Sequence, residues 1–288
     1  MACNSPIYRF LKGSWMPLPC GRCPPCKKRR VDGWVFRLLQ EDKVSTSAHF
    51  ITLTYDPQHV PISPNGFMTL DKTEFPRYMK RLRKLTVNKL KYYACGEYGT
   101  NNKRPHYHAI VFNVPDAEMF FEAWKLDGAH FGQITVGDCT GNSVAYCMKY
   151  IDKAYNEKGL FPGWRPFKGR DDRVPEFALM SKGMGKNYIT PAIVKYHNAD
   201  LSRNYLTVDG GFKIAMPRYY RDRIFDEDAR AAMTSLAEMA AGRAESENYA
   251  RFLKLYERGS LTYAEFKDGQ RTAVVQRFVS QLKNRDLK

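Results

Sequence analysis

Acidic side chains are scarce in this 288-residue sequence, which has 30 Asp and Glu residues against 46 Lys and Arg residues. The resulting net charge of +16 favours a polyanionic partner, and nucleic acid is the first candidate. A membrane surface is the rival, but no apolar run approaches the length of a membrane span and the N-terminus lacks a secretory hydrophobic segment. We therefore expect no membrane association and a location inside a cell.

A disulfide framework is also not expected, because seven cysteines are an odd number and the expected compartment is reducing. Extensive disorder is excluded, since 43% of the residues are hydrophobic and can bury a core. A nucleotide-binding P-loop is absent as well. The basic, glycine-rich turn SKGMGK (residues 181–186) lacks the required spacing, so strand unwinding would need a separate helicase.

Three of the cysteines lie close together near the N-terminus. Cys20, Cys23 and Cys26 are each separated by two residues, and Pro and Gly between them force tight turns. This spacing is typical of a zinc knuckle, for which Cys3 is the candidate fourth ligand of a structural Zn2+. Free thiols in a loop are the alternative. The basic residues 27–30 that follow either bind phosphates or form an ordinary solvated surface.

Two histidines stand at the head of an apolar run, RPHYHAIVF (residues 104–112). In a strand, His106 and His108 share one face because side chains alternate with period two. A strand over residues 90–95, followed by GEYG and a turn, predicts an antiparallel hairpin that brings Glu97 toward His106. Two imidazoles and one carboxylate can hold Mg2+ or Mn2+ and leave positions open for a substrate phosphate oxygen.

A predicted helix over residues 144–155 carries tyrosines and lysines at helical spacing. Tyr146 and Tyr150 occupy one face, and Lys149 and Lys153 lie beside them. A tyrosine hydroxyl has a pKa near 10 and becomes a useful nucleophile when cations stabilise the charge on a phosphate. Each feature alone has a structural explanation, but their combination on a basic chain favours phosphodiester chemistry.

The predicted elements follow the order β-α-β-β-α-β, with helices over residues 69–85 and from residue 116. This order predicts an α+β, ferredoxin-like fold with a central antiparallel sheet and flanking helices. We expect a Cys-rich basic segment (1–45), a core (46–158), an extension with loops and a hairpin (159–225) and a helical tail (226–288). No acidic residue occurs from residue 77 to residue 91, so we expect this stripe to contact phosphates. The predicted DNA contacts are Arg77, Lys80, Arg81, Arg83, Lys84 and Arg104.

The histidine pair followed by Tyr-x-x-Lys resembles the HUH endonuclease superfamily of rolling-circle replication initiators. FITLTY (residues 50–55) resembles its first motif, GEYG with RPHYH (residues 96–99 and 104–108) the second, and YCMKYIDK (residues 146–153) the third. Together with the cysteine cluster and residues 175–181, the first 190 residues are similar to replication initiators of gokushovirus-type phages of the Microviridae. The remainder matches weakly.

The resemblance implies a ferredoxin/RRM-like HUH core that nicks single-stranded phage origin DNA, forms a covalent 5′-phosphotyrosyl intermediate and later religates the strand. It implies metal ligation by His106 and His108, with Glu97 as third ligand. Tyr150 and Tyr146 are the implied nucleophiles, beside Lys153 and Lys149; in a one-tyrosine member Tyr146 would be only a support. A host helicase and polymerase are implied partners, in the cytoplasm of an infected bacterium.

Two alternatives stay open. A plasmid initiator, relaxase or transposase would use the same chemistry. A non-enzymatic, zinc-dependent nucleic-acid-binding protein would use the cysteine cluster and basic helices for affinity, and its histidines would be structural.

Overall fold

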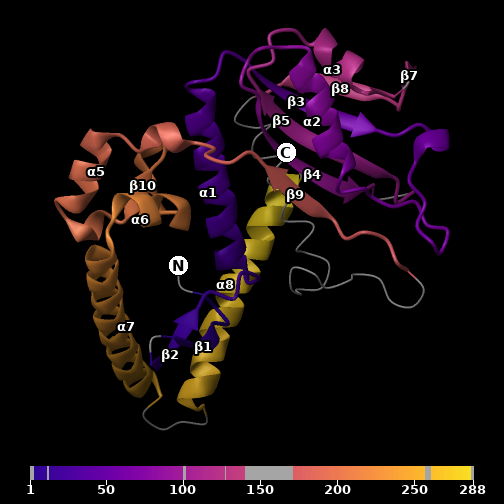
Figure 1. Cartoon of the computed structure of the whole chain (residues 1–288). Coiled ribbons are helices and arrows are strands. Elements are labelled where there is room, and N and C mark those ends of the chain that lie inside the picture. The colour runs from indigo at the N-terminus through magenta and orange to yellow at the C-terminus, as the bar shows by residue number, and fades with distance from the viewer. Residues whose placement is uncertain are drawn as a thin grey trace. The chain divides into compact units, whose positions relative to one another are not determined.

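The computed structural model describes residues 3–11, 13–99, 102–126, 128–139, 171–256 and 261–286. The chain divides into two compact units, and Figure 1 labels their helices and strands. The sheet unit is the continuous segment Arg30–Tyr188. The terminal unit combines Met1–Arg29 with Ile189–Lys288.

A five-stranded sheet forms the centre of the sheet unit, with strand order β8-β3-β5-β4-β9. All four pairings between neighbouring strands are antiparallel. The predicted α+β class with a central antiparallel sheet is therefore confirmed. β5, which carries the two histidines, is the middle strand and is hydrogen-bonded on both sides, so its register is held by backbone pairing along its whole length. The strands are β3 (Ala48–Thr54), β4 (Lys91–Tyr98), β5 (Pro105–Phe112), β8 (Ile134–Asp138) and β9 (Phe177–Met180).

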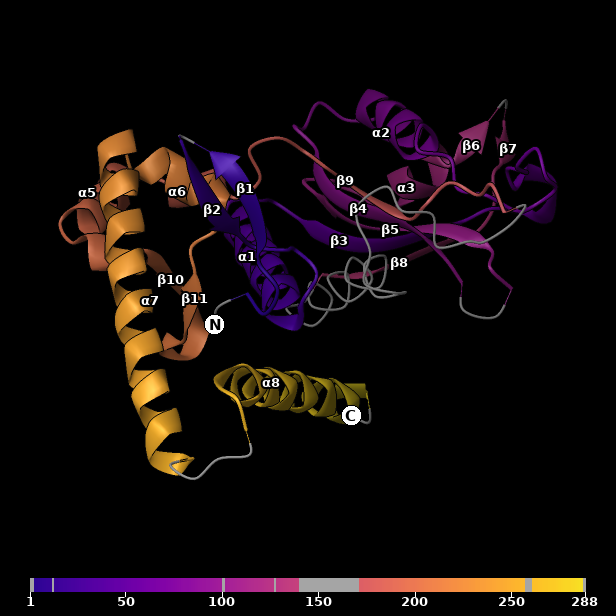
Figure 2. The ribbon, with the colours of Figure 1, turned by 90° about the horizontal axis from the view of Figure 1, so that it is seen from below.

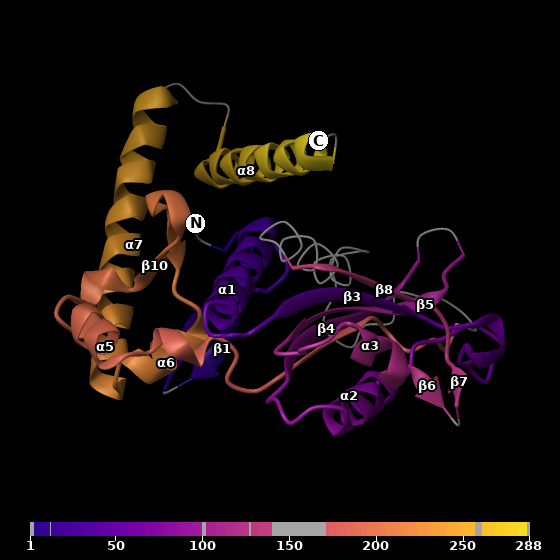
Figure 3. The ribbon, with the colours of Figure 1, turned by 90° about the horizontal axis from the view of Figure 1, so that it is seen from above.

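Two helices, α2 (Glu74–Lys84) and α3 (Glu118–Ala123), cover one face of this sheet (Figures 2 and 3). The apolar residues of α2 recur at helical spacing, and Phe75, Met79 and Leu82 are fully buried against that face. The opposite face packs against residues 30–42 of α1 (Pro24–Asp42), where Leu38 joins Ile110 and Phe112. Alternate residues of β5 thus enter two different cores.

Helix α2 begins at Glu74, later than the expected start at residue 69. The reason is that the preceding residues already have other partners. The hydroxyl of Thr69 accepts a hydrogen bond from the backbone N–H of Val174 at 2.8 Å, and the carbonyl of Asp71 accepts one from the Tyr107 hydroxyl at 2.6 Å. The Asp71 carboxylate instead accepts from the backbone N–H of Thr73, the residue that precedes the helix, at 2.7 Å.

Several short elements complete the sheet unit. β6 (Lys125–Leu126) and β7 (Ala129–His130) form a small hairpin, and 3-10 turns occupy η1 (Pro57–His59) and η2 (Lys186–Tyr188). The sequence analysis does not predict β9. It is a four-residue edge strand whose partner β4 lies about eighty residues earlier, so no local pattern announces it.

The terminal unit contains two hairpins and the C-terminal helices. The Asp-Gly hairpin is present, and Gly210 and Gly211 have φ of 80° and 77°, a conformation that glycine adopts readily. Asp226 caps α7 by accepting from the N–H of Ala229 at 2.8 Å. The elements are β1 (Ile7–Leu11), β2 (Ser14–Leu18), α5 (Pro191–Asn198), η3 (Leu201–Arg203), β10 (Tyr205–Thr207), η4 (Asp209–Gly211), β11 (Lys213–Ala215), α6 (Arg218–Ile224), α7 (Glu227–Leu255) and α8 (Tyr263–Asp286).

Helices α7 and α8 meet through aromatic side chains. Phe252 of α7 lies 5.4 Å from Tyr263 and 5.5 Å from Phe266 of α8, measured between ring centroids. These contacts fit the predicted helical tail, while the expected break at residues 259 and 260 lies outside the described residues. Among the described helices, none combines the length and the apolar character needed to cross a membrane.

Candidate metal and nucleic-acid sites

The hairpin of β4 and β5 places three candidate ligands on one face of the sheet. Glu97 lies directly opposite His106 in the strand register, as predicted, and His108 follows two residues later on the same face. The turn between the strands is closed by a hydrogen bond from the Gly99 N–H to the Arg104 carbonyl at 2.9 Å. This face is the one that also carries Ile110 and Phe112, so the histidines continue the α1 side of the sheet.

The ligand atoms of this triad converge. The Oε1 atom of Glu97 lies 3.0 Å from Nε2 of His106 and 3.7 Å from Nε2 of His108. Neighbouring ligands placed about 2.1 Å from an octahedral cation are separated by about 3.0 Å, so these spacings fit a single divalent cation. Three protein ligands leave other positions of such a cation open.

Side chains behind the triad orient both imidazoles. The Nδ1 atom of His106 lies 3.1 Å from the Arg104 carbonyl oxygen and that of His108 lies 2.9 Å from the Thr52 hydroxyl. Donation of the Nδ1 proton to that carbonyl leaves a lone pair on Nε2 of His106, which is the state that a metal ligand needs. In that state Nε2 and the Glu97 carboxylate both carry lone pairs at 3.0 Å, so a proton or a cation must lie between them. The ring of Phe50 stacks on His108 with centroids 5.8 Å apart.

Glu97 is ionised at neutral pH although only 3% of it is exposed. Burial opposes its ionisation, but hydrogen bonds from His106 and His108 outweigh burial and lower its pKa to about 2. His108 is also buried, at 7% exposure, while His106 is more accessible. A substrate oxygen would therefore approach the triad from the His106 side.

The sequence analysis does not single out Thr52 or Phe50 as part of this site. Both lie in β3, which pairs with β5 so that Thr52 is opposite His108. The signal was present in FITLTY, because residues 50 and 52 alternate onto the histidine face. The predicted residues Tyr146, Lys149, Tyr150 and Lys153 lie outside the described residues, so their place beside the triad stays a prediction.

The four N-terminal cysteines form a second group of candidate ligands, in the terminal unit. Their sulfur atoms all lie within 4.8 Å of one another, and those of Cys3 and Cys23 are 3.7 Å apart. A disulfide needs about 2.05 Å. Sulfurs bound tetrahedrally at about 2.3 Å from zinc are separated by about 3.8 Å, which matches the observed spacing. The group therefore has the dimensions of a closed four-thiolate site.

Cys3 reaches this group because the hairpin of β1 and β2 reverses the chain between residues 7 and 18. Backbone N–H groups then point at the sulfurs, as around bound thiolates. The N–H of Cys20 donates to Sγ of Cys3 at 3.2 Å, and the N–H of Cys23 donates to Sγ of Cys20 at 3.3 Å. The long sequence separation of Cys3 is thus no obstacle, although the sequence analysis does not predict this hairpin.

Comparison with known proteins connects the triad to a family. A family model that describes replication-associated proteins of the ORF2 group matches residues 48–155. The chain is 26% identical to replication-associated protein VP4 of Bdellovibrio phage phiMH2K, over 93% of this chain and 89% of that protein. It is 28% identical to replication-associated protein ORF2 of Spiroplasma virus 4, over 72% and 67% of the two chains. The chain is a Microviridae-like replication-associated protein.

A third relative, replication-associated protein ORF4 of Chlamydia phage 1, is 25% identical over 77% of this chain and 58% of its own length. No solved structure matches the chain. The predicted resemblance to Microviridae initiators is confirmed. The family match begins at β3, includes Glu97, His106 and His108, and ends at residue 155, beyond both candidate tyrosines.

Three of the six predicted DNA contacts have partners within the protein. Arg81 binds Glu74 at 2.9 Å and donates to the Ala123 carbonyl at 2.7 Å, and Arg77 lies 3.7 Å from Asp71. Arg104 donates to the carbonyl of Tyr55. The acids precede the acid-free stripe by one or two helical turns, so a linear scan overlooks them. Lys80, Arg83 and Lys84 remain exposed for solvent or phosphate contact.

Proposed function

We propose that this protein initiates rolling-circle replication by nicking and rejoining single-stranded origin DNA through a covalent 5′-phosphotyrosyl intermediate. The observation that carries the proposal is the convergence of Glu97, His106 and His108 on paired central strands, inside the region matched by the replication-associated family. The β-α-β-β-α-β order with histidines on the middle strand also fits the HUH endonuclease fold.

The triad supplies the ligands for Mg2+ or Mn2+. A cation bound there neutralises charge that develops on the scissile phosphate. The Tyr150 hydroxyl oxygen forms the new bond to phosphorus and gives up its proton, and the bond from phosphorus to the 3′ oxygen breaks and leaves a 3′-hydroxyl. Religation is the reverse reaction. Lys153 stabilises the phenolate, and Tyr146 with Lys149 is a second such pair or, in a one-tyrosine enzyme, a support.

The nature of the relatives supports the proposed setting. The DNA is a single-stranded phage origin, Lys80, Arg83 and Lys84 contact its phosphates, and the reaction takes place in the cytoplasm of an infected bacterium. A host helicase and polymerase complete replication, since the sequence has no Walker-type motif. A plasmid relaxase or transposase is the alternative with the same chemistry. The origin sequence that is cut distinguishes it.

The four-cysteine group is proposed to hold a structural Zn2+. Four thiolates close a tetrahedral site, so no position is left for a substrate, and the role is to fix Cys3 and the first turn of α1 to the knuckle. The non-enzymatic alternative shares this zinc site. It differs in assigning the histidines a structural role, and it predicts no covalent adduct with DNA.

The proposal is tested by incubating the full chain with labelled single-stranded phage origin DNA and Mn2+ or Mg2+, followed by a denaturing gel. We expect a covalent adduct, and mass mapping should find the DNA on Tyr150 or Tyr146. Replacing both tyrosines by phenylalanine should abolish the adduct and leave DNA binding nearly unchanged.

Tyr196→Phe, which alters an exposed tyrosine of the terminal unit, is the matched control and should retain full adduct formation. An adduct that persists in the double variant would exclude the tyrosine mechanism. Absence of an adduct under every metal condition would favour the binding-only protein.

A further inference from the structure

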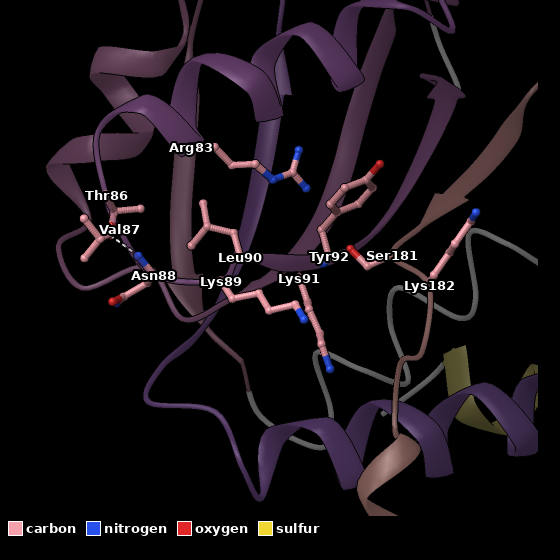
Figure 4. Close-up of a pocket in the computed structure, with 10 residues that line it drawn as sticks. All are labelled: Arg83, Thr86, Val87, Asn88, Lys89, Leu90, Lys91, Tyr92, Ser181 and Lys182. Carbon is pink, nitrogen blue, oxygen red and sulfur yellow. Dashed lines mark hydrogen bonds between the residues drawn. The ribbon is translucent and has the colours of Figure 1, made fainter.

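A pocket of about 530 Å³ lies in the sheet unit where α2 ends and β4 begins (Figure 4). Its walls come from three stretches that are distant in sequence. Arg83 belongs to the last turn of α2, residues 86–92 form the following loop and the start of β4, and Ser181 and Lys182 follow the edge strand β9. A volume of this size admits one small ligand or one residue of a polymer rather than a folded domain.

The pocket is positively charged without local compensation. Arg83, Lys89 and Lys182 are exposed, and none of the described residues that line the pocket is acidic. Lys91 is the exception among the four cations, because it binds the buried Glu41 at 2.6 Å. Solvated surfaces normally mix charges of both signs, so three uncompensated cations from three separate stretches favour an anionic ligand.

An aromatic ring lies beside these cations. The Arg83 guanidinium reaches toward the half-buried Tyr92 ring, whose centroid is 5.9 Å away (Figure 4). Tyr92 is held from behind by Phe75, at 5.1 Å between ring centroids. The Tyr92 N–H donates to the Ser181 hydroxyl oxygen at 3.0 Å, which leaves the hydroxyl proton available to an acceptor such as a phosphate. Cations for phosphates next to a ring for a base are the combination that binds single-stranded nucleic acid.

The pocket is separate from the triad. Tyr92 and Glu97 lie on the same strand, five residues and about 17 Å apart, and an odd separation places their side chains on opposite faces of the sheet. One nucleotide cannot occupy both positions. A continuous strand could reach both by passing the edge of the sheet at β9, where Ser181 and Lys182 lie.

We infer that this pocket binds a flanking segment of single-stranded DNA, at a distance from the scissile phosphate. The inference rests on the proposed function for the identity of the DNA. It adds a second contact that anchors the strand while the triad and the tyrosines act on the phosphate. An acidic protein partner would also be attracted by the charge, but it gives no role to the Tyr92 ring beside Arg83.

The test compares oligonucleotides that cover only the nick site with oligonucleotides extended on the 5′ or the 3′ side, using fluorescence anisotropy. The pocket variant combines Arg83→Gln, Lys89→Gln and Lys182→Gln. The control variant combines Arg243→Gln, Arg251→Gln and Lys254→Gln on α7, and it removes the same number of exposed charges. Wild-type protein should gain affinity when the oligonucleotide is lengthened on one side.

We expect the pocket variant to lose about tenfold of that gain, and the control variant to keep it. The dependence of log K on log salt for the long oligonucleotide should become shallower by about 2, since each single-strand phosphate contact contributes about 0.7. Equal gains and equal salt slopes in the two variants would overturn the inference. The single variants Arg83→Gln and Lys182→Gln, from different stretches, provide the same comparison if the triple variant folds poorly.

Failure of the proposed function would give a different result. Wild-type protein that forms no adduct with the short oligonucleotide would remove the nicking reaction. The length-dependent binding measured by anisotropy would still show whether the pocket holds DNA.

Discussion

The two groups of candidate metal ligands differ in how much of their geometry exists before a metal binds. Glu97, His106 and His108 belong to central strands whose backbone pairing and buried cores fix the ligand positions. The four cysteines lie in loops and the first turn of a helix, with Cys3 brought in by a small hairpin that exposes Phe10 and Trp15. The comparison teaches that three ligands on a rigid sheet suit a working cation, while four thiolates on loosely packed chain suit a cation that holds the chain together.

The largest expected effect is on the triad. His106→Ala removes the most accessible ligand and should reduce the yield of DNA adduct in Mn2+ at least about 100-fold, since changes outside the ligand set alone cost 10–100-fold in metal sites. Folding should be retained because the sheet does not depend on that side chain. His130→Ala, at an exposed histidine of β7, is the control. Wild-type adduct yield in the His106 variant would show that the triad holds no working metal.

The four-cysteine group should respond in the opposite way. Cys23→Ser should eliminate bound zinc, measured by elemental analysis, and lower the free energy of unfolding by several kcal/mol (about 3 or more), because metal binding there contributes to folding. The triad should still bind Mn2+. Cys139→Ser, which alters a half-buried thiol outside the group, is the matched control. Unchanged zinc content in the Cys23 variant would refute the structural site and remove the contrast between the two groups.

The contrast is sharpened by a residue that touches no metal. Thr52→Val removes the hydroxyl that lies 2.9 Å from Nδ1 of His108 and keeps the shape of the side chain. If the sheet alone fixed the site, metal affinity would not change. We expect Mn2+ affinity to fall about 10–100-fold, as for other hydrogen-bonded partners of ligand histidines. Titration of Mn2+ into this variant and into Thr135→Val, an exposed threonine of β8, separates the two outcomes.

The sequence was sufficient for the triad and insufficient for most of what surrounds it. A period-two pattern and a short turn predict that Glu97 lies opposite His106, because both signals are local. The edge strand β9 and the hairpin that brings Cys3 to the knuckle depend on contacts between distant segments. The partners of Arg77 and Arg81 were missed for a third reason, since the acids precede the basic stripe on the same helical face. Periodicity cannot report which charges pair in three dimensions.

The smallest expected effect concerns the frame behind the histidines. Tyr107 lies between them in β5 and points to the opposite face, where its hydroxyl donates to the Asp71 carbonyl at 2.6 Å and lies 2.8 Å from the Tyr55 hydroxyl. Tyr107→Phe should lower the free energy of unfolding by about 1–3 kcal/mol, because it leaves buried polar groups without their partner. The Tyr78 hydroxyl is also buried, but it has no hydrogen-bond partner among the described residues. Tyr78→Phe should therefore be neutral or slightly stabilising.

Alkaline pH provides a second measurement on the same pair. Burial raises the pKa of both Tyr78 and Tyr107 above the ordinary value near 10. Above about pH 10 the unfolded chain loses these protons while the folded chain keeps them, so stability should decrease as pH rises. Each phenylalanine variant should flatten that decrease in chemical denaturation curves. A decrease as steep as in the wild type would mean that the two phenols ionise in the folded state, and the frame behind the histidines would then be more open to water than the sheet site requires.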